Sequence, residues 1–257
     1  MRKLFAPLTI VAAAMFAYAP IMIAGAPYES TMGLVQKIFY FHVPSWFAMF
    51  TAVFVCGIES GIYLFRGKAS ADRVAAAAGE IAVLFGCMGL VTGPLWGRKS
   101  WGVWWQWDAR LTMALLVQLT FVAYLLVRKY GGPGSEKLAA AMAIFGMFNV
   151  PFVYMSVNIW RTIHPPTTVI PRLPSGMPGP FWFSVAAFLL LCVLLLVLRT
   201  ELEHRRKQRP HGGEPDRAAG EKRDHQPRVR EEGGLKHQRD ERRHQHLDGG
   251  QQYQDTE

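Results

Sequence analysis

Six long apolar segments, separated by shorter polar connectors, make up most of the first 198 residues. They cover residues 4–26, 46–65, 74–95, 111–127, 138–157 and 181–198. A helix needs about 20 mostly apolar residues to cross the hydrocarbon core of a bilayer, and each segment is close to that length. The pattern therefore predicts an all-α, polytopic membrane protein with six transmembrane helices.

The first segment has a second interpretation. Arg2 and Lys3 precede it, and Ala24-Gly25-Ala26 resembles the cleavage site of a signal peptide. The apolar stretch is longer than the roughly 7–15 residues usual in a signal peptide, and Pro7 and Pro20 interrupt it. We therefore expect it to remain in the protein as a first spanning helix.

The composition changes after residue 200. Residues 201–257 are rich in Arg, Glu, Gln, His and Gly and show no apolar periodicity, so they cannot bury a core. The sequence predicts a membrane domain over residues 1–200 and a charged, disordered cytoplasmic tail. The three cysteines each lie inside an apolar segment and form no CxxC pair, which is typical of buried small side chains.

The net charge of +9 lies in the connectors of the membrane domain, because residues 199–257 are nearly neutral. When Lys and Arg are counted across six spans, thirteen fall on the side of the two termini and six on the other side. The positive-inside rule therefore predicts cytoplasmic termini. Basic residues scattered over short connectors do not indicate nucleic-acid binding.

The third connector is rich in tryptophan. Residues 96–112, the tryptophan segment, contain five of the eight tryptophans. If residues 101–108 are helical, the i, i+3, i+4, i+7 spacing places three indoles and one carboxylate on one face. These are Trp101, Trp104, Trp105 and Asp108, with Trp107 pointing elsewhere. Such a face suits a flat, amphipathic aromatic ligand such as haem, although interfacial aromatic belts also concentrate tryptophan.

Two histidines remain outside the tail, His42 in the first connector and His164 in the fifth. Because odd-numbered connectors emerge on the same side of the membrane, both are predicted to meet the tryptophan segment at the outer face. A proline follows each histidine within two residues and stiffens the backbone there. Either histidine alone is equally typical of a cap or an interface residue, but two opposed imidazoles are axial ligands of haem iron.

Haem propionates need cations, and arginines on the same side can supply them. The candidate haem-binding residues are His42, His164, Trp96, Trp101, Trp104, Trp105, Trp107, Asp108, Arg161, Arg172, Arg98 and Arg110. Zinc fits less well, because two imidazoles and Asp108 would leave the indoles without a role. Transmembrane electron transfer is disfavoured, since no predicted span contains a histidine.

Smaller signals concern helix packing and capping. Gly57-x-x-x-Gly61 and Gly89-x-x-x-Gly93 allow close approach of helices. Ser45 is expected to cap the second helix and Asp108 the fourth, which is also an ordinary structural explanation for that aspartate. The acidic residues within spans are Glu59 and Glu80. Glu59 is the one polar hint of a solute transporter, and a bond across a helix pair explains it equally well.

Residues 101–112, Trp-Gly-Val-Trp-Trp-Gln-Trp-Asp-Ala-Arg-Leu-Thr, resemble the WWD signature of the haem-handling proteins of cytochrome c maturation. With six spans and one histidine in each flanking outer loop, residues 1–200 resemble the haem exporter protein C (CcmC) family of the system I pathway. The resemblance implies that His42 and His164 are axial ligands of haem b, held non-covalently as transient cargo. It implies the periplasmic face of the bacterial inner membrane as the location.

The resemblance also implies partners. These are the haem chaperone CcmE as acceptor, the small membrane protein CcmD, and the ATP-binding-cassette subunits CcmA and CcmB, in a lipid membrane. The chain has no Walker motif, so ATP hydrolysis would belong to a partner. We expect a non-enzymatic delivery subunit. The alternative is a WWD-type haem lyase, a cytochrome c synthase component acting directly on apocytochrome, for which the outer connectors are short.

Overall fold

A computed structural model of the protein describes residues 2–29, 32–165 and 169–208. The described residues form six α-helices and two short 3₁₀ helices, with no β-strand. The helices are α1 (Arg2–Gly25), η1 (Leu34–Ile38), α2 (Phe39–Arg66), α3 (Ala69–Trp101), α4 (Ala109–Tyr130), α5 (Ser135–Ile159), η2 (Ile170–Arg172) and α6 (Pro178–Gln208). Each predicted span corresponds to one α-helix that is long and apolar enough to cross a membrane. The predicted fold class is confirmed.

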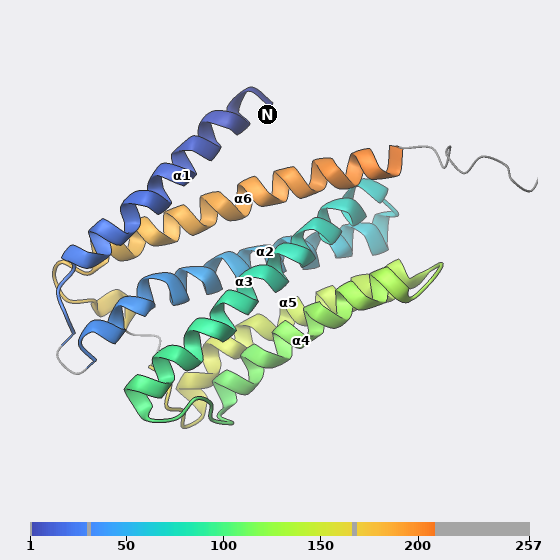
Figure 1. The fold of residues 1–257 in the computed structure, drawn as a ribbon. Coiled ribbons are helices and arrows are strands. Elements are labelled where there is room, and N and C mark those ends of the chain that lie inside the picture. Colours follow the sequence, from blue (N-terminus) through green and yellow to red (C-terminus); the bar gives the residue numbers. More distant parts are fainter. Residues whose placement is uncertain (1, 30–31, 166–168, 209–257) are drawn as a thin grey trace, which may run out of the picture. The chain divides into compact units, whose positions relative to one another are not determined.

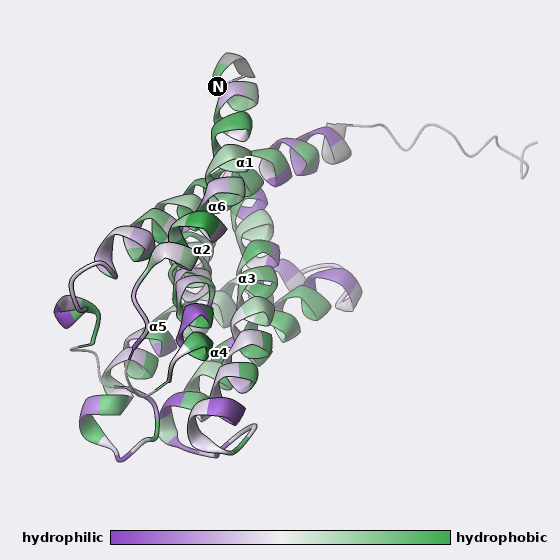
Figure 2. Ribbon diagram, turned by 60° about the vertical axis from the view of Figure 1, so that its left-hand side comes forward, coloured by the Kyte–Doolittle hydropathy of each residue, from purple (hydrophilic) through white to green (hydrophobic). Residues whose placement is uncertain are grey.

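The helices associate as three neighbouring pairs. α2 packs along α3 in the centre, α1 lies on α6 to one side, and α4 pairs with α5 on the other side (Figure 1). Apolar residues run along the helices, whereas hydrophilic residues gather towards the helix ends (Figure 2). Large apolar side chains such as Ile21, Phe145 and Phe148 are exposed on the helix surfaces. A lipid environment accommodates such surfaces, because the backbone polar groups are already paired within the helices.

The central pair approaches closely at two glycines of α3. A Cβ atom on Gly89 would lie 2.5 Å from Cε2 of Trp46 in α2, and one on Gly93 would lie 3.2 Å from Cε1 of His42. This confirms the predicted close approach at that motif. In the other motif, Gly57 faces Met147 of α5, whereas a Cβ atom on Gly61 would meet nothing within 4 Å.

Two ion pairs connect α3 to its neighbours at the end where α2 and α4 end. Asp72 accepts hydrogen bonds of 2.6 and 3.1 Å from Arg128 of α4. Glu80 accepts two bonds of 2.6 Å from Arg199 of α6. Both pairs are bidentate, the strongest geometry for an arginine and a carboxylate. Glu80 therefore joins two helices at this end of the bundle.

The helices α2 to α6 all extend beyond their predicted spans. α2 begins at Phe39 and continues through Pro44, which a membrane helix can accommodate. The predicted cap at Ser45 is wrong, since its hydroxyl lies inside α2 and donates to the His42 carbonyl at 2.7 Å. α6 continues to Gln208, and the ion pairs Arg199–Glu203 and Glu201–Arg205 support its last turns. The rest of the predicted tail, 209–257, lies outside the described residues.

The close approach at α3 predicts different effects for two similar substitutions. We expect Gly89→Ala to lower the stability by about 1–3 kcal/mol, because the Trp46 ring must move to admit a methyl group. Gly61→Ala is the matched control, since it meets open space and alanine is the better helix former by about 1 kcal/mol. Thermal unfolding in detergent measures both. Equal melting temperatures would contradict the packing argument.

Candidate functional site

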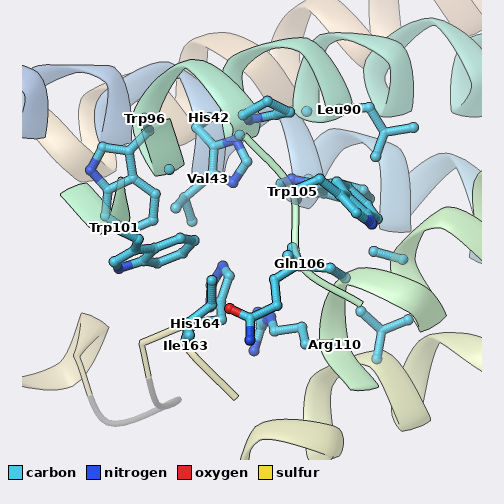
Figure 3. A pocket seen from close by; sticks show the side chains of 18 of the residues that line it. His42, Val43, Leu90, Trp96, Trp101, Trp105, Gln106, Arg110, Ile163 and His164 are labelled. Carbon is cyan, nitrogen blue, oxygen red and sulfur yellow. The ribbon is translucent and has the colours of Figure 1, made fainter. Parts of the chain in front are cut away.

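A cavity of about 500 Å³ lies among α2, α3, α4 and α5, at the end of the bundle where α3 and α5 end (Figure 3). We call it the tryptophan pocket, because six tryptophans line it. They are Trp46, Trp96, Trp101, Trp104, Trp105 and Trp182. In Figure 3, Trp96 and Trp101 lie together on one side and Trp105 lies across the space from them. This volume and apolar lining are typical of sites for small organic ligands.

Both histidines predicted as ligands reach the tryptophan pocket from opposite sides (Figure 3). His42 projects from α2 and is 7% exposed, and His164 projects from the connector after α5 and is partly buried. The Trp96 ring lies to one side of both, with its centroid 6.3 Å from each imidazole centroid (Figure 3). Residues more than a hundred positions apart therefore face one space.

Hydrogen bonds determine which ring nitrogen of each histidine is protonated. Nδ1 of His42 lies 2.9 Å from the Thr92 hydroxyl oxygen, which donates its own hydrogen to the Met88 carbonyl and so accepts from the ring. Nδ1 of His164 lies 3.1 Å from the Pro165 carbonyl oxygen, which can only accept. In both imidazoles Nδ1 carries the hydrogen. Nε2 therefore keeps a lone pair for a metal ligand bond.

The electrostatic environment keeps His164 neutral. Burial, followed by the positive charge of Arg110, lowers the pKa of His164 to about 3. A neutral imidazole is the form that binds a metal. At neutral pH no proton has to leave His164 before it can act as a ligand.

Arg110, in the first turn of α4, is the cation of the tryptophan pocket. Its side chain is partly buried and lies beside Gln106 and His164 in Figure 3. Within the described part of the chain Arg110 forms no ion pair. Withdrawing a charge from water without a partner is costly, so this position favours a ligand that carries an anionic group.

The tryptophan segment does not form the predicted helix. α3 ends at Trp101, because Gly102 adopts a left-handed conformation with φ of 78° that stops the helix. Trp96 and Trp101 belong to the last turns of α3, whereas Trp104 and Trp105 lie in an irregular connector. The common helical face was therefore a wrong prediction, yet these four indoles line one cavity. Trp107 is 74% exposed, outside the lining, and packs edge-to-face on Trp105.

The four arginines predicted to bind haem do not gather at one site in the structure. Arg110 lines the tryptophan pocket, and the other three do not. Arg98 donates to the Gly102 carbonyl at the end of α3, and Arg161 and Arg172 are exposed in the connector after α5. Asp108 also lies outside the lining. Its carboxylate accepts a 2.8 Å hydrogen bond from the Leu111 amide, which confirms the predicted cap of α4.

Sequence reasoning missed several contributors to the tryptophan pocket. Trp46 follows His42 by one turn of α2, so a helix predicted to begin before His42 would have identified it. Because His42 lies in a helix, the argument that no span contains a histidine was wrong for this residue. Nothing in the sequence identified Thr92 as a partner of His42, except its position next to Gly93. Trp182 of α6 gave none, because only the tertiary structure brings it to the cavity.

Comparisons with known proteins agree on one family. The family model described as "Heme exporter protein C" matches residues 1–212. A protein of that name from Bradyrhizobium diazoefficiens is 33% identical over 190 residues, covering 70% of this chain and 72% of its own. The Escherichia coli K12 protein of that name is 30% identical, covering 68% and 72%. A Marchantia polymorpha "Putative cytochrome c biosynthesis ccmC-like mitochondrial protein" is 29% identical, covering 68% and 76%.

The lowered pKa of His164 predicts a pH-dependent stability. Above about pH 6.5, the pKa of an unfolded histidine, this residue is neutral in both states and has no effect. Below it the unfolded chain binds the proton, so stability falls by up to about 1.4 kcal/mol per pH unit until the folded pKa of about 3 is reached. We expect His164→Gln to lose less melting temperature than the parent protein between pH 7 and 5. Parallel melting curves would contradict this assignment.

Proposed function

The chain belongs to the heme exporter protein C family, and from that membership we propose that it is a haem-binding, non-enzymatic membrane subunit of cytochrome c maturation. It holds haem in the tryptophan pocket and delivers it to the haem chaperone CcmE. One observation carries the proposal. Two imidazoles face one apolar cavity from opposite sides, and each makes a hydrogen bond through Nδ1, which leaves Nε2 as the ligand atom.

The axial ligands in this proposal are His42 and His164. Haem iron accepts an imidazole on each face. Histidine ligands usually donate their second N–H to an oxygen acceptor, which fixes the ring orientation. Thr92 and the Pro165 carbonyl are such acceptors. The protein would thus present both rings in the tautomer that ligation requires.

The remaining lining fits the rest of the haem molecule. Indole rings offer wide apolar surfaces for a porphyrin, and the Trp96 and Trp105 indole N–H groups are buried without a partner among the described residues. Arg110 would hold a propionate, because a guanidinium matches a carboxylate in shape and charge. Arg98, Arg161, Arg172 and the exposed Trp107 stay candidates for contacts outside the lining. When bound, haem b would be transient, non-covalent cargo.

Location and partners follow from family membership and charge. We propose the bacterial inner membrane, with the tryptophan pocket at the periplasmic face, because the basic residues favour the opposite side. The small membrane protein CcmD and the ATP-binding-cassette subunits CcmA and CcmB are the proposed partners. Trp104, 58% exposed at the pocket, offers an apolar surface where an acceptor such as CcmE could approach.

A haem lyase acting on apocytochrome is less well supported. Such an enzyme needs a surface that positions a polypeptide beside haem. The irregular part of the tryptophan segment, 102–108, is a short connector, and the pocket end of the described chain carries no folded domain. Delivery to a chaperone needs less surface and fits these connectors better.

The visible spectrum tests the axial ligands. We expect the protein purified from haem-replete cells to contain haem with a six-coordinate, bis-imidazole spectrum. His42→Ala and His164→Ala should each remove that signature, because each deletes one iron ligand. His204→Ala is the control, since His204 lies in α6, away from the tryptophan pocket. Colourless parent protein, or spectra unchanged in both variants, would refute the proposal.

A second experiment tests the propionate site. We expect Arg110→Gln to weaken haem retention about tenfold, because a charge-assisted hydrogen bond is lost inside an apolar pocket. Arg66→Gln removes the same charge at the far end of α2, outside the lining, and should retain haem normally. Competition with a haem-binding apoprotein, such as apomyoglobin, gives both dissociation rates. Equal rates for the two variants would exclude Arg110 as the propionate contact.

A further inference from the structure

We propose that Asp108 is a positioning residue that ties the start of α4 to the connector bearing His164 and thereby holds that imidazole ready to bind iron. The inference rests on the proposed function. It concerns how one ligand is oriented, since Asp108 itself lies outside the pocket lining.

The two carboxylate oxygens of Asp108 have different partners. Oδ1 accepts from the Leu111 amide at 2.8 Å and caps α4. Oδ2 accepts from the Thr162 hydroxyl and, at 3.2 Å, from the Ile163 amide. The Thr162 oxygen in turn accepts from the His164 amide at 3.1 Å. A continuous series of hydrogen bonds therefore connects the first turn of α4 with the backbone of His164.

These hydrogen bonds position the backbone of His164, which the contacts of its ring do not hold. The Pro165 carbonyl sets the ring tautomer, and Trp96 and Trp101 pack against the imidazole at centroid distances of 6.3 and 6.2 Å. These contacts act on the side chain. The backbone of His164 lies in a connector without regular structure, so its position depends on Asp108 and Thr162.

A carboxylate suits this position better than other capping residues. Three donors converge on it, and an ionised carboxylate has acceptor sites on both oxygens and no hydrogen of its own. A residue that served only as a cap would need one oxygen. The use of the second oxygen on the His164 connector indicates the additional role. It also connects the tryptophan segment to the connector that bears His164.

The decisive substitution is Asp108→Asn. Asparagine is as good an N-cap as aspartate, so Oδ1 can continue to cap α4. Its amide NH₂ group, however, faces the Ile163 amide, which can only donate, so that hydrogen bond is lost. Only a reversed bond from the asparagine to the Thr162 oxygen can remain, which weakens the connection to His164. We expect the bis-imidazole spectrum to give way to a five-coordinate, high-spin form. Added imidazole should restore the six-coordinate spectrum by filling the vacated position.

A second pair of variants leaves α4 untouched. Thr162→Val removes the hydroxyl and should reproduce the Asp108→Asn spectrum, whereas Thr162→Ser keeps the hydroxyl and should behave as the parent. The double variant Asp108→Asn, Thr162→Val should be no worse than the more affected single variant, because both break the same series of hydrogen bonds. Fully additive effects would contradict a shared role.

Hydrogen exchange on the haem-free protein separates this inference from the proposed function. We expect the Ile163 and His164 amides to exchange about tenfold faster in Asp108→Asn, since each loses its acceptor or the support of that acceptor. Unchanged exchange, or an unchanged spectrum in Asp108→Asn and Thr162→Val when His164→Ala does alter it, would overturn the positioning role. Failure of the parent protein to bind haem would refute the proposed function instead.

Discussion

The contact between α2 and α3 is the constraint on which the tryptophan pocket depends. Gly89 and Gly93 let the two helices approach until Trp46 and His42 lie directly against the α3 backbone. This contact brings His42 within hydrogen-bond distance of Thr92, which determines the ring tautomer. One wall of the pocket is therefore an integral part of the central helix pair. The opposite wall, with His164, lies in a connector and needs hydrogen bonds of its own.

Charged side chains form ion pairs between helices at one end of the bundle, whereas, in the part of the chain that the structure describes, Arg110 at the other end does not. Where α2 and α4 end, Asp72 and Glu80 are paired bidentately with arginines of neighbouring helices, so these charges stabilise the assembly. At the pocket end Arg110 faces the cavity without an ion pair among the described residues. Asp108 acts on Arg110 electrostatically but forms no direct ion pair with it, so an anionic ligand group would stabilise this partly buried cation.

The sequence predicted the six helices from the length and hydropathy of the apolar segments. It also predicted that His42, His164 and the tryptophan segment lie at the same end of the bundle, because odd-numbered connectors emerge on one side. It did not predict where α2 begins, since the local rule that proline breaks a helix does not hold at Pro44, which lies inside α2. It considered residues 101–108 as one helix from the spacing of the tryptophans and overlooked Gly102, a residue type that commonly ends a helix, after the basic residues Arg98 and Lys99. Trp182 and the second contact of Asp108 depend on tertiary structure, which no local pattern contains.

The order of the pocket residues along the polypeptide bears on how the protein is made. His42 is synthesised early and most of the tryptophans follow, but His164 and Trp182 come only with the last third of the membrane domain. A ribosome-bound chain with four inserted helices would expose a half-built cavity containing a single imidazole. The second imidazole can reach the cavity only after α5 and its connector have been synthesised. The complete lining therefore forms only when nearly the whole membrane domain has been made.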